Sequence, residues 1–517
     1  MMLKLKIIAI AIPILLCSGS VFAQFPPIQW QHCYGGSDFD DATVAIPLGD
    51  TGFAIAGTAS SYDGDRVSPF CGGADFWLVN IDNYGAIKWE RSYGGNFSDN
   101  DFAMTKTSFG YLLAGVTNST YGEVTGLHGD QTNPQNDCWV VATDTAGNLL
   151  WERCYGGSKL EMCYSMVNTD DGNHIFAGLT SSNDGDVAGY TGLGGAWVVK
   201  FNDTGKIIWQ KVYDSSTAFS IKQTSGHGYV VTGYSVASNL GPDRKGDLWV
   251  VKLNDTGGIT WRKFFGGTGY DWGKTVVQTT DGGYVIAGYT NSVDGDITGN
   301  HGGNDLWVLK LNSAGVKQWS KVYGGSGDDE ATSIIQTFDG GYLVSGYSNS
   351  IDGDITGNLG LYDIWILKLD AAGSLQWQKS YGGSLDDYSA ATSQTPDSGF
   401  IVAGDSHSNN DEVSGNHGAS DYWIVRLDKY GEAVPDPKKD EAVKVYPTAG
   451  HGTVYIDMPP GYEAATIQLF NMDGQELPGA SSNGLHQTIQ LQNSTFGNYL
   501  IQVTHNGNVQ TFKVVVY

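Results

Sequence analysis

Basic residues are scarce in this chain of 517 residues. Lysine and arginine together number 29, against 55 aspartates and glutamates, so the formal net charge at pH 7 is −26. A surface of that sign repels the phosphate backbone of nucleic acids and the headgroups of anionic membranes. The composition therefore predicts that nucleic acid is not a partner of this protein.

Signatures of catalysis are also missing. The sequence contains no H-E-x-x-H zinc motif, no G-x-S-x-G nucleophile motif and no glycine loop followed by Lys-Ser/Thr, and its ten histidines lack ligand spacing. Two carboxylates for glycoside cleavage could come from different repeats, but acids recur so often that no pair stands out. The sequence therefore favours a non-enzymatic function.

The chain has no long apolar stretch beyond its N-terminal region, so we expect no transmembrane segment. At the N-terminus, two lysines precede the apolar run 7–16, and the cleavage sequence VFA follows at 21–23. This pattern is typical of an export signal over residues 1–23. A lipid anchor on Cys17 is the alternative, although two leucines stand where a lipoprotein signal has small residues.

Few cysteines remain once the signal is removed. They are Cys33, Cys71, Cys138, Cys154 and Cys163. An odd number leaves at least one thiol unpaired, and no spacing among them matches a zinc site. Export would permit a disulfide. We interpret these residues as mostly buried small side chains and leave one local disulfide open, without assigning its pair.

Glycine, tyrosine and tryptophan are abundant instead, with 72, 28 and 15 residues. A W-x-x-x-[YF] pattern occurs seven times at spacings of 52 to 62 residues, and a second tryptophan, typically in D-x-W, lies twelve residues before six of these copies. Such a period indicates a repeat architecture. Fourteen tryptophans are in register: Trp30, Trp89, Trp151, Trp209, Trp261, Trp319 and Trp377 in the first series, and Trp77, Trp139, Trp197, Trp249, Trp307, Trp365 and Trp423 in the second.

One repeat unit contains four strand candidates. From residue 331 they are ATSIIQT, YLVSGYS, IWILKL and SLQWQKSY, separated by the turn FDGG, a long loop and the turn DAAG. Glycine in such tight turns accepts the positive φ that a hairpin requires. Each unit is therefore a four-stranded antiparallel meander, and a common spacing of 58 residues suits one blade of a β-propeller.

The two ends of the repeat region complement each other. Twelve residues after Trp423 stands Pro435, which cannot donate to a β-ladder, so the last unit lacks its fourth strand. The N-terminal segment around Trp30 is a fourth strand without the preceding three. Placing it in the gap removes exposed strand edges. We predict an all-β fold, a seven-bladed β-propeller over residues 24–434 that is closed by the N-terminal strand.

The YGGS-x-x-D and DGGY-x-x-x-G motifs of these units resemble those of secreted bacterial β-propeller repeat proteins. The resemblance covers residues 24–434 and implies the fold, but it says little about function. The fourth unit departs from the pattern, because its sequence YDSSTAFSIKQTSGHGYVV lacks the Gly-Gly and the acidic pair. This blade is expected to pack differently.

Residues 443–517 follow a linker at 435–442 and resemble the C-terminal sorting domain of type IX secretion substrates, a small β-sandwich. The matching motifs are Tyr446-Pro447, Asp473-Gly474 and Gly497-Asn498-Tyr499, whereas Thr448-Ala449 replaces the usual Asn-Pro and the chain ends on Tyr517 rather than on a basic residue. The resemblance implies a Bacteroidota-type bacterium, export through the periplasm by the type IX secretion machinery, and release or attachment to the outer-membrane surface.

Acidic loops recur in the propeller region. NSVDGDITGN at 291–300 returns as NSIDGDITGN at 349–358. Two carboxylates that flank a glycine suit Ca²⁺, the one candidate cofactor. They also suit a turn in which the first aspartate accepts backbone N–H bonds, and this role is favoured because a full EF-hand pattern is absent. The candidate metal ligands are Asp63, Asp65, Asp184, Asp186, Asp294, Asp296, Asp352 and Asp354.

The acidic loops and the YGGS loops share one face of the expected propeller. Six units carry an acid ten residues after the first-series tryptophan, and we expect these acids to join neighbouring blades. Tyr270, Asp271 and Trp272, in the loop GTGYDWGK on that face, form the candidate ligand-binding site. An exposed aromatic pair could stack on a sugar ring, and the aspartate could accept hydroxyl bonds, although packing against the loop itself is favoured.

These features predict a secreted or surface-displayed binding or adhesion module, exported by type IX secretion, whose ligand is a glycan or an extracellular protein. The alternative is a polysaccharide-degrading hydrolase or lyase that uses acidic residues on the propeller face. A third hypothesis, a structural surface-coat protein, predicts no ligand at all.

Overall fold

The computed structural model describes residues 25–69, 72–187, 189–190, 192, 194–214, 216–236 and 245–428, and a set of strands between residues 444 and 516. The chain forms two compact units, Met1–Gly431 and Glu432–Tyr517, which are described separately. The predicted export signal at 1–23, the predicted linker at 435–442 and Cys71 lie outside the described residues.

The described part of the first unit contains seven four-stranded antiparallel sheets, so the predicted seven-bladed, all-β propeller is confirmed. The seventh sheet has the order β1-β28-β27-β26 and includes the N-terminal strand. The first three sheets are β2 (Asp40–Pro47), β3 (Phe53–Ala59), β4 (Asp75–Ile81) and β5 (Ile87–Tyr93); β6 (Asp99–Lys106), β7 (Gly110–Thr117), β8 (Asp137–Asp144) and β9 (Leu149–Tyr155); β10 (Glu161–Asn168), β11 (His174–Thr180), β12 (Gly195–Phe201) and β13 (Ile207–Asp214). The other four are β14 (Ser216–Gln223), β15 (Tyr229–Ser235), β16 (Asp247–Leu253) and β17 (Ile259–Phe265); β18 (Asp271–Gln278), β19 (Tyr284–Thr290), β20 (Asp305–Leu311) and β21 (Lys317–Tyr323); β22 (Asp329–Gln336), β23 (Tyr342–Ser348), β24 (Asp363–Leu369) and β25 (Leu375–Tyr381); and β26 (Asp387–Gln394), β27 (Phe400–Ser406), β28 (Asp421–Leu427) and β1 (Ile28–Tyr34).

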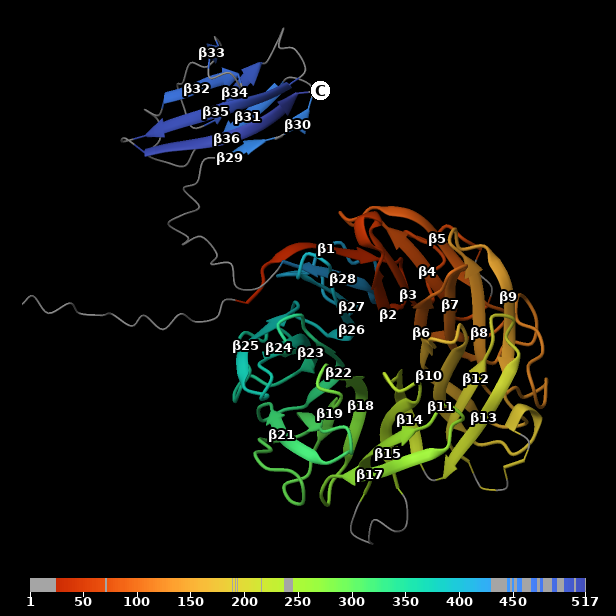
Figure 1. Cartoon of the computed structure of the whole chain (residues 1–517). Helices are drawn as coiled ribbons and strands as arrows, with labels where there is room; N and C mark the ends of the chain where they lie inside the picture. Colours follow the sequence, from red (N-terminus) through yellow and green to blue (C-terminus); the bar gives the residue numbers. More distant parts are fainter. Residues whose placement is uncertain are drawn as a thin grey trace, which may run out of the picture. The chain divides into compact units, whose positions relative to one another are not determined.

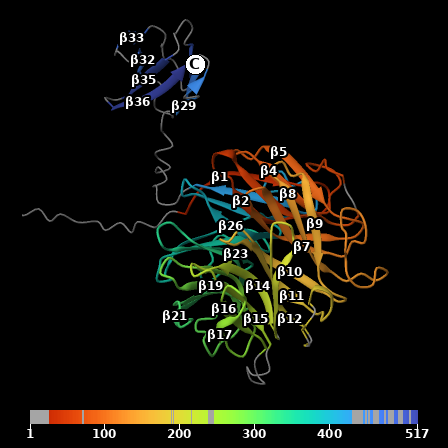
Figure 2. The same ribbon diagram turned by 45° about the vertical axis from the view of Figure 1, so that its right-hand side comes forward.

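The seven sheets form a ring in which the first strand of each blade lies nearest the axis and the fourth lies at the rim (Figure 1). A view turned by 45° shows the same strands around that axis (Figure 2). Each innermost strand contacts the innermost strands on either side, all the way around the ring. These strands are β2, β6, β10, β14, β18, β22 and β26.

The apolar core lies between the blades. The seven second-series tryptophans stand on the third strands and are completely buried. Each core cluster draws on two neighbouring blades; one of them, for example, joins Val308 of β20 to Trp365 of β24. The regular spacing of tryptophan in the sequence therefore reflects one large aromatic side chain at each junction, which buries much apolar area.

The tyrosine of the W-x-x-x-Y pattern has a fixed partner in the next blade. Its hydroxyl donates to a glycine carbonyl in the turn between the third and fourth strands of that blade, as in Tyr34 to Gly85 and Tyr155 to Gly205, both at 2.6 Å. The same bond recurs from Tyr93, Tyr213 and Tyr323. This contact explains why tyrosine recurs at a position that ends the outermost strand.

In four blades, an aspartate in the turn between the first and second strands pairs with a buried cation. In the fifth blade, the Lys310 ammonium is 2.8 Å from an Asp281 oxygen, and the lysine side chain is only 3% exposed. The third, sixth and seventh blades contain the equivalent pairs Lys200–Asp171, Lys368–Asp339 and Arg426–Asp397. These pairs lie on the face of the turns, opposite the acidic loops.

Neighbouring turns on this face are also joined by a hydrogen bond from a backbone N–H to a glutamine side chain. The N–H of Phe338 in the sixth blade donates to Gln394 Oε1 in the seventh at 3.0 Å, and Gln223, Gln278 and Gln336 accept equivalent bonds. Between the seventh and first blades both positions are proline. Pro396 has no N–H to donate and Pro47 has no side-chain acceptor, so this tie is absent at the junction where the N-terminal strand enters.

The fourth blade keeps the four-stranded meander despite its divergent sequence. Its turn has Gly226 where the fifth blade has Asp281, and His227 adopts a φ of 60° where the fifth blade has glycine. The half-buried Lys252 donates to the carbonyl of Leu253 at 2.9 Å and forms no ion pair with the described residues. The divergence therefore alters the contacts of the blade rather than its topology.

The second unit contains two sheets in its described part. A three-stranded sheet has the order β29-β31-β34, and a five-stranded sheet has the order β30-β36-β35-β32-β33. The strands are β29 (Lys444–Tyr446), β30 (Ala449–Gly450), β31 (Thr453–Asp457), β32 (Thr466–Asn471), β33 (Glu476–Leu477), β34 (His486–Gln490), β35 (Gly497–His505) and β36 (Asn508–Val516).

Candidate functional site on the inner surface of the ring

The predicted calcium loops are held to the backbone of the preceding interblade connection. Asp294 Oδ1 accepts a hydrogen bond from Thr268 N–H at 2.8 Å. The N–H of Asp296 donates to Gly266 O at 3.0 Å, and its Oδ2 accepts from Gly266 N–H at 3.3 Å. The other oxygen of Asp296 is 2.5 Å from Lys317 Nζ. Both carboxylates therefore have partners within the protein.

The three equivalent loops repeat this arrangement. The first aspartate accepts a serine N–H, from Ser37 to Asp63, from Ser158 to Asp184 and from Ser326 to Asp352. The N–H of the second aspartate, in Asp65, Asp186 and Asp354, donates to a glycine carbonyl. Within the described residues, no three His, Cys, Asp or Glu side chains are grouped so that they could hold a metal ion. Calcium binding in these loops stays a prediction.

Tyr270, Asp271 and Trp272 do not form one site. The sequence predicted a loop here, but β18 begins at Asp271, and side chains of a strand alternate between its two faces. Asp271 is completely buried and accepts the Gly267 N–H at 2.8 Å. Tyr270 is 43% exposed and lies under the Lys245 ammonium. Trp272 alone faces the inner surface of the ring.

The acids equivalent to Asp271 have the same structural role. Each is completely buried and accepts the N–H of the second glycine of the YGG motif that ends the preceding blade, over 2.7 to 2.9 Å. They therefore join neighbouring blades, as expected from their recurrence. They are Asp40, Asp99, Glu161, Asp329 and Asp387.

Each innermost strand carries a β-bulge at its fourth residue. In β18, Gly273 pairs with Gly288 and Thr275 with Ala287, which leaves Lys274 without a cross-strand partner. A bulge turns a side chain away from the regular pleat. The second and fourth residues of these strands are mostly partly exposed, whereas the first and third are buried. The second and fourth residues form what we call the inner surface of the ring. The other bulged residues are Thr43, Phe102, Tyr164, Phe219, Thr332 and Ala390.

Aromatic rings follow one another across four successive innermost strands, β6, β10, β14 and β18. The ring centroids of Phe102 and Tyr164 are 5.7 Å apart, those of Tyr164 and Phe219 5.2 Å, and those of Phe219 and Trp272 5.5 Å. Trp272 also stacks face to face on Tyr234, with centroids 4.4 Å apart and planes inclined by 7°. This row offers flat, partly exposed apolar area on one half of the inner surface.

Lys274 stands among these rings. Its Nζ is 4.9 Å from the ring centroid of Phe219, 5.0 Å from that of Trp272 and 5.7 Å from that of Tyr289. Cation–π contacts stabilise the ammonium form. Burial nevertheless lowers the pKa of Lys274, while the negative charge of Glu330 acts in the opposite direction. A hydrogen-bond donor is thus placed beside the aromatic row.

The other half of the inner surface includes Glu330 and Tyr388, and two tyrosines from adjoining elements pack beside them. Glu330, the second residue of β22, accepts a hydrogen bond from the Tyr347 hydroxyl at 2.7 Å. Tyr347, Tyr362 and Tyr388 pack against one another with ring centroids 5.0 to 5.6 Å apart. Carboxylate and phenol groups on one half therefore oppose aromatic faces and an amine on the other.

Two carboxyl groups come together where the first and seventh blades meet. Asp41 is the second residue of β2 and Asp405 belongs to β27. Burial raises the pKa of both groups, and the charge of Asp41 raises that of Asp405 further. His407 Nδ1 is 3.9 Å from Asp405 Oδ2, and the Ser420 hydroxyl donates to Asp41 at 2.9 Å. A carboxyl whose pKa is raised by burial and by a neighbouring acid is an arrangement found in general acid catalysis.

The sequence predicted Trp272 as a functional residue but not Phe219, Tyr234 or Lys274. A signal was nevertheless present in the repeats. The second residue of the innermost strand is Asp, Asn, Met, Thr, Trp, Glu and Tyr in the seven units, whereas the first residue is acidic in six. Positions that differ between units in an otherwise constant frame are the ones that packing leaves free for function.

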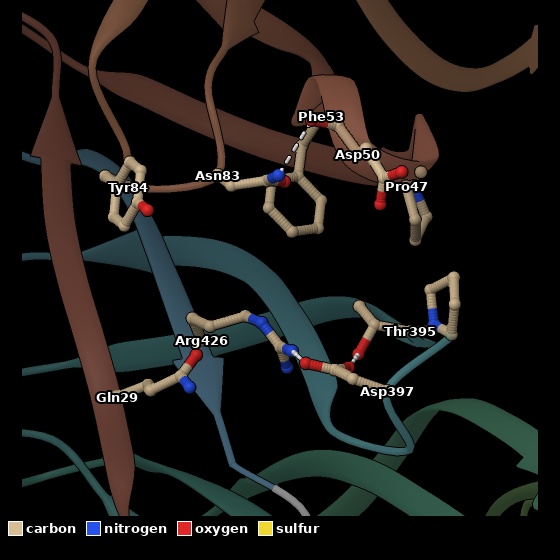
Figure 3. A pocket seen from close by; sticks show the side chains of 11 residues that line it. Gln29, Pro47, Asp50, Phe53, Asn83, Tyr84, Thr395, Asp397 and Arg426 are labelled. Atoms are coloured by element: carbon tan, nitrogen blue, oxygen red, sulfur yellow. Dashed lines mark hydrogen bonds and ion pairs between the residues drawn. The ribbon is translucent and has the colours of Figure 1, made fainter. Parts of the chain in front are cut away.

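A groove lies on the face of the turns, between the first and seventh blades (Figure 3), and has a volume of 280 Å³. The Arg426 guanidinium in its wall is already paired with Asp397, and the Asn83 amide donates to Asp50 O at 2.9 Å. An equivalent groove of 490 Å³ lies between the fifth and sixth blades. Because this groove recurs with the repeat, it is a weaker candidate for a ligand-binding site than the inner surface.

Comparison with known proteins identifies the second unit. Residues 444–517 match the family model of the secretion system C-terminal sorting domain, which confirms the type IX sorting domain expected from the sequence. The propeller thus carries a signal for type IX export. No curated protein matches the chain. Among the described residues, helices with the length and hydropathy needed to cross a membrane are absent.

Several solved structures are similar to the chain at low identity. They include the WD40 β-propeller domain of Doa1, with 10% identity, a TM-score of 0.45 and coverage of 79% of this chain and 97% of that chain. The Pan2 WD40 domain of Neurospora crassa has 9% identity, a TM-score of 0.41 and coverage of 74% and 88%. Puromycin hydrolase has 11% identity, a TM-score of 0.43 and coverage of 91% and 61%. Similarity at this level supports no inference about function.

Proposed function

We propose that this exported propeller is a binding module whose inner surface takes up a neutral glycan, either free or carried by an extracellular protein. In this proposal residues 1–23 are the export signal, residues 24–434 form a propeller closed by β1, and residues 443–517 form a small β-sandwich. The pairing of β1 with β28 supports the closure. The sorting domain directs the protein to the type IX machinery, and from there to the medium or the cell surface.

The aromatic row is the observation that carries this proposal. Trp272 lies against Tyr234 with its indole partly exposed, and its Nε1 is buried without a hydrogen-bond partner among the described residues. An aromatic ring that stays partly exposed beside other rings offers a flat face on which a sugar ring can stack. The neighbouring Lys274 and Glu330 supply a donor and an acceptor for hydroxyl groups. A net charge of −26 disfavours polyanions, which makes a neutral glycan the better fit.

Affinity electrophoresis of the full chain tests the proposal, with a soluble β-glucan, a mannan and an α-glucan in separate gels. We expect at least one polysaccharide to retard the protein. Trp272→Ala should weaken that interaction by about fivefold or more, because an aromatic stacking contact contributes about 1 kcal/mol beyond its buried area. Tyr84→Ala removes an exposed ring from the groove of Figure 3 and serves as the control.

Two results would contradict the proposal. One is migration that no polysaccharide alters. The other is retardation that Trp272→Ala leaves unchanged. If Tyr84→Ala abolishes the retardation instead, the site lies in the groove between the first and seventh blades.

A hydrolase or lyase that acts on polysaccharide is the second candidate function, and the pair of Asp41 and Asp405 favours it. In this case Asp405 is the general acid, because burial and the neighbouring charge of Asp41 raise its pKa well above the ordinary value of an aspartate. Release of reducing ends from the same three polysaccharides is the measurement. Activity that is lost in Asp405→Asn would establish this function. If the unaltered protein releases no reducing ends, this second function is refuted and the binding module stands.

Calcium belongs to the proposal only as a stabiliser of the acidic loops. The thermal midpoint of the full chain, measured in EDTA and then in millimolar Ca²⁺, tests this role. A ligand at 100 times its Kd stabilises the folded state by about 2.7 kcal/mol. A rise in midpoint that disappears in Asp294→Ala/Asp296→Ala would show binding, whereas equal midpoints in EDTA and Ca²⁺ would restrict these loops to a structural role.

A further inference from the structure

Two cysteines from neighbouring blades meet in the core. Cys138 lies on β8 of the second blade and Cys163 on β10 of the third, and these two strands pack together. Both side chains are completely buried in one apolar cluster as free thiols, and the neighbouring Cys163 contributes to the raised pKa of Cys138. Cys33 and Cys154 lie in different clusters and have no cysteine beside them among the described residues.

The route of this protein favours oxidation of such a pair. Its sorting domain directs it out of the cell, and exported proteins encounter oxidising conditions in which disulfides form and persist. Thiols are weak hydrogen-bond donors, so the reduced pair gains little from its contact. We propose that Cys138 and Cys163 form a disulfide that fastens the second blade to the third.

The folded protein itself shields these sulfurs, so the bond must form before the two blades dock. Neither cysteine has exposed area, and burial holds the pKa of Cys138 well above its usual value, which suppresses the reactive thiolate. In the undocked chain, one thiolate attacks the disulfide of an oxidant, either a protein disulfide or an oxidised low-molecular-weight thiol, and a mixed disulfide forms as one thiol leaves. The second thiolate then attacks the mixed disulfide and releases the other thiol. The cysteines lose two protons, and the oxidant takes up two electrons.

The bond would stabilise the propeller mainly through the unfolded chain. It closes a loop of about 25 residues that spans the junction of two blades, and such a closure reduces the conformational freedom of the unfolded state. The junctions of the other blades depend on packing, hydrogen bonds and ion pairs. Among the junctions that the structure describes, this one alone would then be held by a covalent bond.

Peptide mapping of the full chain tests the proposal directly. The protein is refolded in a mixture of reduced and oxidised glutathione, unfolded, alkylated without a reductant and digested with trypsin. Cleavage after lysine and arginine places Cys138 in the peptide 107–153 and Cys163 in the peptide 160–200, while Cys33, Cys71 and Cys154 fall in three other peptides. We expect 107–153 and 160–200 to appear as one linked species that reduction separates, with Cys33 and Cys154 alkylated. Alkyl groups on both Cys138 and Cys163, or a link from either to another cysteine, would overturn the proposal.

A stability measurement distinguishes the disulfide from simple packing of two thiols. Cys138→Ala should lower the thermal midpoint of the oxidised protein by several degrees more than that of the protein kept in reductant. Cys33→Ala is the matched control, because Cys33 is buried in a cluster that contains no other cysteine among the described residues, and it should lower both midpoints equally. An equal loss for Cys138→Ala under both conditions would mean that the residue only fills space, and would refute the disulfide.

Discussion

The two faces of the propeller place aspartates in opposite electrostatic settings. On the face of the turns, Asp281 accepts a hydrogen bond from the Lys310 ammonium, which lowers the pKa of this carboxyl to about 2. On the face of the acidic loops, Asp363 is completely buried, and burial together with the charge of Asp387 raises its pKa to about 7. The same residue type therefore stabilises the folded state on one face and destabilises it on the other near neutral pH.

The first glycine of the YGG motif explains why two acids can share a site on the loop face. A Cβ on Gly382 would lie 2.5 Å from Asp363 Oδ1 and 2.8 Å from Asp387 Oδ2, which is too close for any side chain. Two carboxyl groups thus converge on a bare Cα. Equivalent pairs converge on Gly35 and Gly324. The repeat excludes a side chain here because the acids that join the blades occupy the space.

The largest effect is expected from removing the acid of an ion pair on the turn face. Asp281→Ala leaves the ammonium of Lys310, whose side chain is 3% exposed, with the oxygens of Leu311 and Gln318 as its only partners among the described residues. Breaking a fully buried pair costs about 3 to 5 kcal/mol. Because the Asp281 side chain is 55% exposed, we expect a smaller loss of about 2 kcal/mol in the free energy of unfolding, measured by urea denaturation.

Asp255→Ala is the control for this measurement. Asp255 lies in an exposed turn between the third and fourth strands of the fourth blade, so its removal should change the free energy of unfolding by less than about 0.5 kcal/mol. Equal effects of the two substitutions would show that the buried cation does not depend on its aspartate.

A pH titration compares the two faces in one experiment. The pKa of Asp363 is about 7 in the folded protein and about 4 in an unfolded chain, so the folded state binds more protons between these values, and stability falls as the pH rises through 7. Asp99, Asp305 and Asp421, with pKa values of about 6, act in the same direction. Asp281 has the opposite sign, because its contribution is present above pH 4 and is lost as the pH falls toward 2. The thermal midpoint should therefore rise by several degrees from pH 8 to pH 5 and fall again below pH 4.

Asp363→Asn identifies the source of the alkaline loss. This variant lacks a proton to release near pH 7, so its thermal midpoint should decline less between pH 5 and pH 8 than that of the unaltered protein. A decline of the same size in both would show that the pair of Asp363 and Asp387 is not responsible.

The fold could be predicted from the sequence because its packing is periodic. Tryptophans equivalent to Trp365 and Trp377 recur at regular intervals along the sequence, because a large side chain is required at each junction between blades. The site could not be predicted in the same way. Asp271 and Trp272 are adjacent in the chain but face opposite sides of β18, whereas Trp272, Tyr234 and Phe219 come from three different strands and meet only through the order of the blades. Contacts of that kind depend on register and on the bulge in each innermost strand, which the sequence does not mark.

A smaller effect is expected at the junction of the seventh and first blades, where the glutamine tie is missing. Pro396→Thr supplies the N–H and Pro47→Gln supplies the acceptor, so the double variant can form the bond that Phe338 makes with Gln394. Either substitution alone should be neutral or slightly destabilising, because proline restricts the unfolded chain. A double-mutant cycle should give a favourable coupling of about 1 kcal/mol in the free energy of unfolding. A coupling of zero would show that the two turns are too far apart to be tied.

The smallest effect is expected from restoring the missing acid of the fourth blade. Gly226 has no atom within 4 Å of the position that a Cβ would take, and its backbone does not adopt a positive φ, so aspartate fits there without strain. Gly226→Asp places a carboxylate near the half-buried Lys252, whose pKa is lowered by desolvation, as Asp281 is placed near Lys310. The gain should be about 0.5 to 1 kcal/mol, because the new acid is partly exposed. Gly226→Asn is the matched control, since it adds the same volume without the charge. If both variants raise the free energy of unfolding equally, the gain comes from a stiffer turn. The charge of the new carboxylate would then contribute nothing to the stability of the fourth blade.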